Sequence, residues 1–68
     1  MKNVFSENLR RLRIEKKLKQ EELAKSLCTT QRKVSYWESG KIEPDINSLW
    51  AIADFFEISI DELVGRES

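Results

Sequence analysis

Four side chains that can hydrogen-bond to the edges of DNA bases fall close together in one short segment. Val34 and Trp37 are spaced i, i+3, which makes a narrow inward stripe if the segment is a helix. At about 100° per residue, the outward side near the start of that helix carries Gln31, Arg32, Ser35 and Tyr36. Glutamine can bond adenine through two atoms, arginine can bond guanine, and hydroxyl groups can donate or accept. The segment therefore has the side-chain chemistry of a base-reading helix.

Two short helices joined by a tight turn must position this face. The apolar spacing predicts one helix over Gln20–Leu27 and a second over Gln31–Ser39, so a helix-turn-helix spans about residues 20–39. Ala24 is small where the two helices approach each other. Thr30 is a candidate N-cap for the second helix, and Gly40 suits the left-handed residue that follows it.

The rest of the chain also has helical periodicity. It predicts three further helices, from Asn3 or Val4 to about Glu15–Lys17, over residues 46–56, and after Ser59 to Leu63 or Val64. Asp45 and Ser59 are the N-caps expected for the last two. No segment alternates with a period of two over a useful length, so we expect an all-α fold of five helices that forms a single domain over residues 1–68.

Charge is divided unevenly along a chain whose formal net charge is zero. Residues 1–41 carry eleven Lys or Arg against five Asp or Glu, whereas residues 42–68 carry one base against seven acids. A neutral protein with a basic half can still attract a polyanion on that side. The alternative is a solvated surface on which the charges happen to cluster.

Several other chemistries are disfavoured by composition. The 68 residues include no histidine, one cysteine (Cys28) and two glycines, so we expect no His-based catalysis, no metal site, no phosphate-binding loop and no cofactor. An enzyme and a small-molecule ligand are therefore not expected. The chain lacks the run of roughly 18 apolar residues that a membrane span needs, and residues 1–7 do not resemble a secretory signal. We expect a cytoplasmic protein associated with the nucleoid.

The sequence resembles the Cro- and lambda-repressor-like helix-turn-helix domains, also called the Xre type, from Phe5 to Val64. The resemblance is carried by the matching segments Leu9-Arg10-Arg11-Leu12-Arg13, Leu18-Lys19-Gln20-Glu21-Glu22-Leu23-Ala24, Val34-Ser35-Tyr36-Trp37-Glu38-Ser39-Gly40-Lys41, Pro44, Leu49, Ile52-Ala53-Asp54 and Ile58-Ser59-Ile60-Asp61-Glu62-Leu63. It implies five helices, with the third inserted in the major groove of DNA.

The resemblance also implies roles for individual residues. Gln31, Arg32 and Tyr36 would contact bases, with Ser35 beside them, and Gln20, Thr30 and Lys41 would contact phosphates. The position of Lys33 next to Arg32 makes it a fourth candidate for a phosphate contact. Arg13 and Glu38 match positions that form a buried ion pair between the first and third helices.

The chain departs from the family pattern at three kinds of position. Lys17, Cys28 and Glu57 stand where glycine is frequent, and a left-handed backbone would cost each about 1 kcal/mol and could open the turn at Cys28. Lys19 replaces the Ser or Thr that would cap the second helix, which removes about 1 kcal/mol of capping. Asp45 replaces a base found in some relatives, so no minor-groove contact is expected there.

We therefore expect a transcriptional regulator that binds double-stranded DNA sequence-specifically, a repressor of bacterial or phage type. The alternative is a protein-interaction module, such as an antitoxin or adaptor, that keeps the fold without specific DNA binding. An apolar surplus in the C-terminal half points to a homodimer that reads an inverted-repeat operator; its members are Trp50, Phe55, Ile58, Ile60 and Val64. A monomer with these residues buried is the competing possibility.

Overall fold

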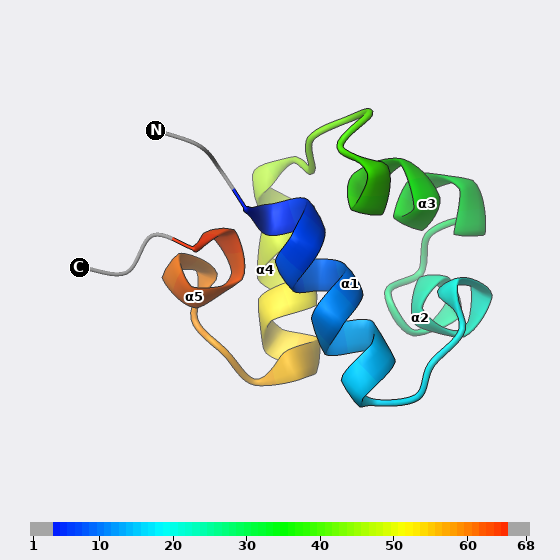
Figure 1. Cartoon of the computed structure of the whole chain (residues 1–68), viewed down its shortest axis with the longest axis horizontal. Helices are drawn as coiled ribbons and strands as arrows, with labels where there is room; N and C mark the ends of the chain where they lie inside the picture. Colours follow the sequence, from blue (N-terminus) through cyan, green and yellow to red (C-terminus); the bar gives the residue numbers. More distant parts are fainter. Residues whose placement is uncertain (1–3, 66–68) are drawn as a thin grey trace.

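The computed structural model describes residues 4–65, and within that range the chain forms helices and no strands. The helices are α1 (Phe5–Glu15), α2 (Gln20–Ser26), α3 (Gln31–Ser39), α4 (Ile46–Phe56) and α5 (Ile60–Val64) (Figure 1). The five predicted helices are confirmed. α2 is one residue shorter than expected, because Leu27 adopts the C-cap position. α1 begins after Val4, and Asn3, the other expected start, lies outside the described residues.

Side-chain caps define where three of the helices begin. Thr30 Oγ1 accepts a hydrogen bond from the backbone N–H of Lys33 at 3.2 Å, Asp45 Oδ1 from that of Ser48 at 3.1 Å, and Ser59 Oγ from that of Glu62 at 3.0 Å. The three predicted N-caps are thus confirmed. Hydrogen bonding from Ser48, through its side chain and then its backbone, lowers the pKa of the Asp45 carboxyl below its ordinary value.

The start of α2 is held differently, because a lysine cannot accept a hydrogen bond as a cap. Lys19 makes no side-chain cap. Instead, the carboxylate of Glu22 reaches back and accepts the backbone N–H of Lys19 at 2.8 Å. This is half of a capping box, and it satisfies one N–H that would otherwise lack a partner.

Three residues that follow helices have a left-handed backbone without being glycine. Their φ values are 58° at Lys17, 57° at Cys28 and 58° at Glu57, so each of these positions has the left-handed backbone considered in the sequence analysis. The turn at Cys28 nevertheless stays closed. Cys28 donates its backbone N–H to Lys25 O at 3.2 Å, and Thr29 donates to Ala24 O at 2.9 Å.

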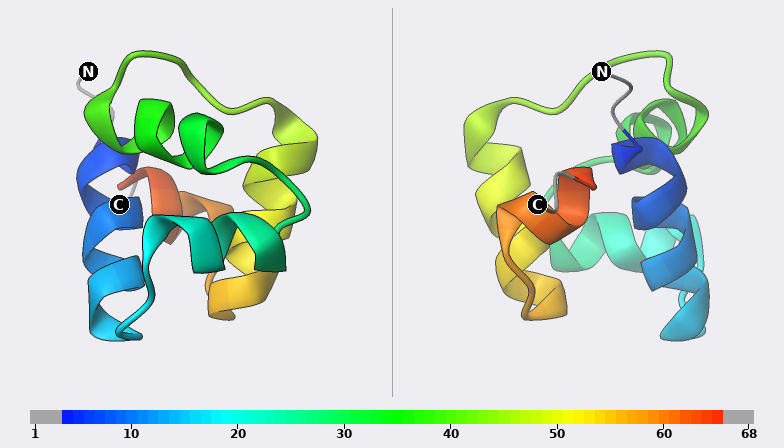
Figure 2. Two further views of the ribbon diagram at one scale, coloured as in Figure 1. Left: turned by 90° about the vertical axis from the view of Figure 1, so that its right-hand side faces the viewer. Right: turned by 60° about the vertical axis from the view of Figure 1, so that its left-hand side comes forward.

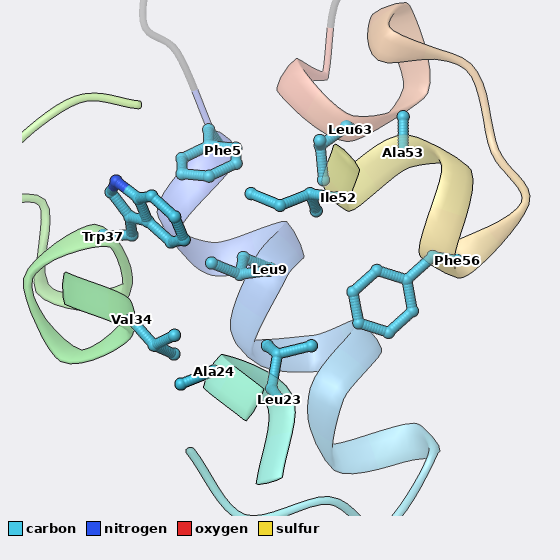
Figure 3. Close-up of a cluster of buried hydrophobic side chains, with 10 residues drawn as sticks. All are labelled: Phe5, Leu9, Leu23, Ala24, Val34, Trp37, Ile52, Ala53, Phe56 and Leu63. Carbon is cyan, nitrogen blue, oxygen red and sulfur yellow. The ribbon is translucent and has the colours of Figure 1, made fainter. Parts of the chain in front are cut away.

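A core of ten buried side chains draws on all five helices (Figure 3). α2 and α3 pack together, α1 packs against α3 and α5, and α4 packs against α5 (Figures 1 and 2). Leu9 of α1 and Trp37 of α3 are almost fully buried, which confirms that Trp37 belongs to the core.

In the part of the chain that the structure describes, no helix has the length and apolar character needed to cross a bilayer.

The two ends of the domain are tied to each other. Val4 donates its backbone N–H to Val64 O at 3.4 Å, and Asn8 Nδ2 donates to Glu62 O at 3.2 Å and Leu63 O at 3.0 Å. Gly65 ends α5 at φ 77°, and a Cβ there would overlap Val4 Cγ2. A side chain at position 65 would therefore push the start of α1 away from α5.

The two left-handed glycines allow a matched test of this contact. Gly40→Ala should cost about 1–2 kcal/mol from backbone strain alone, because φ is 78° there while the added Cβ would lie 3.6 Å from its nearest atom, Ser6 Oγ, an ordinary contact. Gly65→Ala has the same backbone strain and should cost at least about 1 kcal/mol more, because Val4 must also move. Urea denaturation of the two variants measures the difference. Equal losses of stability would show that Val4 moves without cost.

Candidate nucleic-acid interface

The start of α3 presents its polar side chains to solvent. Gln31, Arg32 and Lys33 are exposed in the first turn, whereas Ser35 and Tyr36 are half-buried. Tyr36 is less exposed than the helical periodicity predicts, and Lys41 Nζ lies over its ring at 5.2 Å from the centroid. Val34 and Trp37 are buried and form the predicted inward stripe.

The candidate phosphate contacts surround this face. Thr30 stands at the N-cap of α3, where its oxygen accepts the cap hydrogen bond and its hydroxyl hydrogen remains able to donate. Lys33 and Lys41 are exposed, while Gln20, at the first position of α2, is half-buried. The structure therefore brings cationic and neutral donors to both ends of α3.

Arg13 and Glu38 lie in contact between α1 and α3. Arg13 Nε donates to Glu38 Oε2 at 2.6 Å and Nη2 donates to Oε1 at 3.1 Å, which makes the pair bidentate. Their side chains are 13% and 5% exposed. The remaining nitrogen, Nη1, donates to Leu18 O at 2.7 Å, so the same guanidinium also holds the loop that leads into α2.

Two glutamines extend this pair to the start of α3. Gln20 Nε2 donates to Glu38 Oε1 at 3.1 Å, and Gln31 Nε2 donates to Gln20 Oε1 at 2.7 Å. Neither contact is predicted by the sequence. The signal that was available is that Gln20 and Gln31 each occupy the first residue of a helix, and the two helices adjoin in a helix-turn-helix.

An open depression of about 430 Å³ lies at the junction of α2 and α3. It is lined by Arg13, Lys19, Gln20, Glu21 and Gln31. Residues 19–41 carry five bases and three acids, and one of these acids, Glu38, is neutralised by Arg13. The surface of this segment is consequently net positive, with Glu21 as the acid nearest the depression.

Within residues 4–65, no three His, Cys, Asp or Glu side chains are grouped so that they could hold a metal ion. Cys28, the one cysteine of the sequence, is exposed in the turn between α2 and α3.

The apolar residues of the C-terminal half that were expected at a dimer contact differ in their exposure to solvent. Trp50 is 55% exposed, whereas the other members, Phe55, Ile58, Ile60 and Val64, are half-buried against the core. Phe55 packs edge-to-face on Phe56 with ring centroids 5.0 Å apart. Ile46, one helical turn before Trp50, is 54% exposed and was not predicted to be part of an exposed patch. The exposed apolar stripe is therefore Ile46 and Trp50, on α4.

These features define a class of protein. α2, the turn at residues 27–30 and α3 form a helix-turn-helix; α1 packs against α3, and α5 packs against α1 and α4. A family model described as helix-turn-helix matches residues 9–63. The chain belongs to this family, in its Cro- and lambda-repressor-like branch.

Two relatives are similar over nearly all of this chain. The chain is 46% identical over 63 residues to the HTH-type transcriptional activator BcrR of Enterococcus faecalis, covering 93% of this chain and 31% of that protein. It is 38% identical over 65 residues to the uncharacterized HTH-type transcriptional regulator YqaE of Bacillus subtilis, strain 168, covering 96% of this chain and 56% of that protein. The chain thus spans about a third and about half of these two relatives. Neither name denotes an enzyme, as the sequence predicts.

Two solved structures share the fold. A transcriptional regulator from Listeria innocua matches with a TM-score of 0.93 at 43% identity, covering 100% of this chain and 64% of that one. The P22 c2 repressor, solved in complex with synthetic operator 9T in the presence of Tl⁺, matches with a TM-score of 0.86 at 27% identity. That match covers 93% of this chain and 96% of the repressor chain. The predicted five-helix fold is confirmed by both.

Breaking the buried pair should cost far more than breaking an exposed one. Arg13→Met leaves the Glu38 carboxylate buried without its counter-charge and should destabilise the fold by about 3–5 kcal/mol. Arg11→Met removes the Arg11–Glu15 pair of the same helix, which is exposed, and should cost less than about 1 kcal/mol.

Chemical denaturation at neutral pH compares these two variants with the wild type. Similar small losses in both would mean that water reaches Glu38 when Arg13 is removed.

Proposed function

We propose that this domain binds duplex DNA sequence-specifically, with α3 in the major groove, and that it regulates transcription. One observation carries the proposal. The exposed start of α3 presents an amide and a guanidinium, Gln31 and Arg32, between candidate phosphate contacts at its N-cap and beyond its C-terminus. These are the groups that read adenine and guanine edges in the major groove.

The proposed contacts fall into two kinds. Gln31, Arg32, Ser35 and Tyr36 read bases, and Gln20, Thr30, Lys33 and Lys41 bond phosphates. Phosphate contacts position the protein and make its affinity salt-dependent, whereas base contacts provide discrimination. The net positive charge of residues 19–41 supports this arrangement, because it favours approach of the DNA backbone.

The names of similar proteins support a regulator. The P22 c2 repressor was solved with an operator, and BcrR is named as an activator. Because both signs of regulation occur on the same fold, we propose that the sign follows from where the operator lies relative to the promoter. An operator that overlaps the promoter gives the repression expected from the sequence. We propose accordingly that the protein acts in the cytoplasm, at the nucleoid.

Selection from a randomised duplex pool tests this function, followed by titration of the enriched duplex against salt. We expect an enriched inverted repeat whose affinity falls steeply as salt rises. An enriched single half-site would keep DNA binding and remove the dimer. No enrichment, with weak binding even at low salt, would overturn the proposal in favour of a protein-interaction module such as an antitoxin or adaptor.

A homodimer is the second part of the proposal. The exposed stripe of Ile46 and Trp50 on α4 supports it, because large apolar side chains spaced i, i+4 form a continuous contact surface. Phe55, Ile58, Ile60 and Val64 add their exposed edges to the same half of the chain. Two copies related by a two-fold axis would present two α3 helices about 34 Å apart, one turn of duplex.

Neighbouring cations of α3 should have different effects on binding. Arg32→Ala should relax preference at one base pair by about 1–3 kcal/mol, because a bidentate base contact is lost. Lys33→Ala should weaken binding equally on all sequences and reduce the salt slope by about one, because only a phosphate contact is lost. Fluorescence anisotropy on a panel of single-base operator variants measures both effects.

Uniform weakening by Arg32→Ala across that panel would contradict its assignment as a base reader.

Two exposed apolar residues allow a matched test of the dimer. Trp50→Ser should convert the dimer to an 8.0 kDa monomer, whereas Ile14→Ser, at a residue of similar exposure (51%) on α1, should leave the dimer intact. Sedimentation equilibrium with and without operator measures the mass. Wild-type protein that sediments at 8.0 kDa in both conditions would overturn the dimer.

A further inference from the structure

A lysine that follows the C-terminal end of α3 lies over an aromatic ring of the same helix. Lys41 Nζ is 5.2 Å from the centroid of the Tyr36 ring, within the roughly 6 Å at which an ammonium is attracted to an aromatic face. Lys41 is exposed, whereas Tyr36 is half-buried. Both residues belong to the proposed DNA contacts, Tyr36 as a base reader and Lys41 as a phosphate contact.

We infer that the Tyr36 ring positions the Lys41 ammonium for a DNA phosphate, so that a base reader and a phosphate contact act as one unit. This inference rests on the proposed function and gives Tyr36 a second role in it, as a positioning residue. The contact with Lys41 uses the face of the ring, so the hydroxyl group at its edge can still bond a base.

The backbone at the end of α3 brings these two side chains together. The helix ends in a Schellman motif, in which Gly40 donates its N–H to Trp37 O at 3.3 Å and Lys41 donates its N–H to Tyr36 O at 2.9 Å. Gly40 has the left-handed backbone that this motif requires, with φ 78°. The side chains at the positions of Tyr36 and Lys41 in such a motif frequently make an apolar contact. In this chain, an ammonium on an aromatic face takes the place of that contact.

An aromatic ring can hold a lysine without cancelling its charge. A carboxylate partner would neutralise the ammonium, as Glu38 neutralises Arg13, and would compete with a phosphate. The ring attracts the cation and leaves N–H donors available. Apart from the Tyr36 ring, the Lys41 ammonium has no hydrogen-bond or ion-pair partner in the described part of the chain, residues 4–65. It is therefore held in place and still able to bind an anion.

Positioning matters because a lysine side chain is flexible. Its four-carbon stem has many rotamers, and fixing them at an interface costs affinity. If the ring holds Lys41 before the DNA arrives, part of this cost is avoided. Lys33, a proposed phosphate contact in the first turn of α3, is exposed and lies over no aromatic ring of residues 4–65. The two lysines therefore form a matched pair, one positioned by a ring and one not.

A double-mutant cycle between positions 36 and 41 tests the inference. Tyr36→Leu removes the ring but keeps the hydrogen bonds of the Schellman motif, because these use the backbone carbonyl of residue 36. On the selected operator, we expect Lys41→Ala to lower the affinity by a factor at least about threefold smaller in Tyr36→Leu than in the wild type. Fluorescence anisotropy measures the four affinities.

Tyr36→Phe separates the ring from the hydroxyl group. It removes a base contact and keeps the aromatic face, so the full effect of Lys41→Ala should return and the salt slope should stay at the wild-type value. In Tyr36→Leu the salt slope should fall towards that of Lys41→Ala, which is lower than the wild-type slope by about one. A purely structural role of Tyr36 would not change the salt slope.

Lys33→Ala is the control for the cycle. Its effect on affinity should be the same, within about twofold, in Tyr36→Leu and in the wild type. An effect of Lys33→Ala that shrinks as much as that of Lys41→Ala would show a general weakening of the interface and would overturn the inference.

The remaining outcomes separate the inference from the proposed function. If Lys41→Ala has the same effect, within about twofold, in Tyr36→Leu and in the wild type, the inference is overturned and DNA binding stands. A wild-type protein that selects no sequence overturns both.

The free protein offers a readout that depends neither on DNA nor on the folding of a variant. The methylene protons next to Lys41 Nζ lie near the face of the Tyr36 ring, so their NMR signals should be shifted upfield of the corresponding signals of Lys33. Tyr36→Phe should keep this shift and Tyr36→Leu should remove it. Lys41 signals that coincide with those of Lys33 in the wild type would overturn the inference.

Discussion

The contact between Arg13 and Glu38 is the interaction on which the rest of the interface depends. Two opposite charges are taken out of water between α1 and α3, and two parallel hydrogen bonds compensate for the lost solvation. The same guanidinium bonds Leu18 O and the same carboxylate bonds Gln20, so the loop before α2 and the start of α2 are held as well. The orientation of α3 relative to the other helices is therefore specified by directional bonds as well as by apolar packing.

Apolar packing supplies the remaining constraint, because helices this short are marginal in isolation. α2 has seven residues and α5 has five, so both depend on burying side chains such as Leu23 and Leu63 in the shared core. Side-chain caps define where α3, α4 and α5 begin, and left-handed residues define where the same three helices end. The start of α3 is consequently held both by its cap at Thr30 and by the burial of Val34 and Trp37.

Features that depend on local sequence could be predicted, and features that depend on tertiary placement could not. The bounds of the helices follow from caps such as Thr30 and from apolar spacing, both of which act within a few residues. The partners of Gln20 could not be found in this way, because they belong to different helices and a glutamine has many rotamers. The exposure of Ile46 was missed for a related reason. Its place on α4 is apolar by sequence, and whether it is covered depends on how the helices pack in three dimensions.

The bond between Val4 and Val64 has a consequence for the evolution of the domain. Val4 and Val64 are in contact, and in Figure 1 they lie on the side away from the start of α3. The chain therefore enters and leaves the domain at nearly the same place. Such a unit can be inserted into a host polypeptide, or have its termini relocated by circular permutation, without disturbing the helix-turn-helix. This portability agrees with a domain that accounts for 31% of one relative and 56% of another.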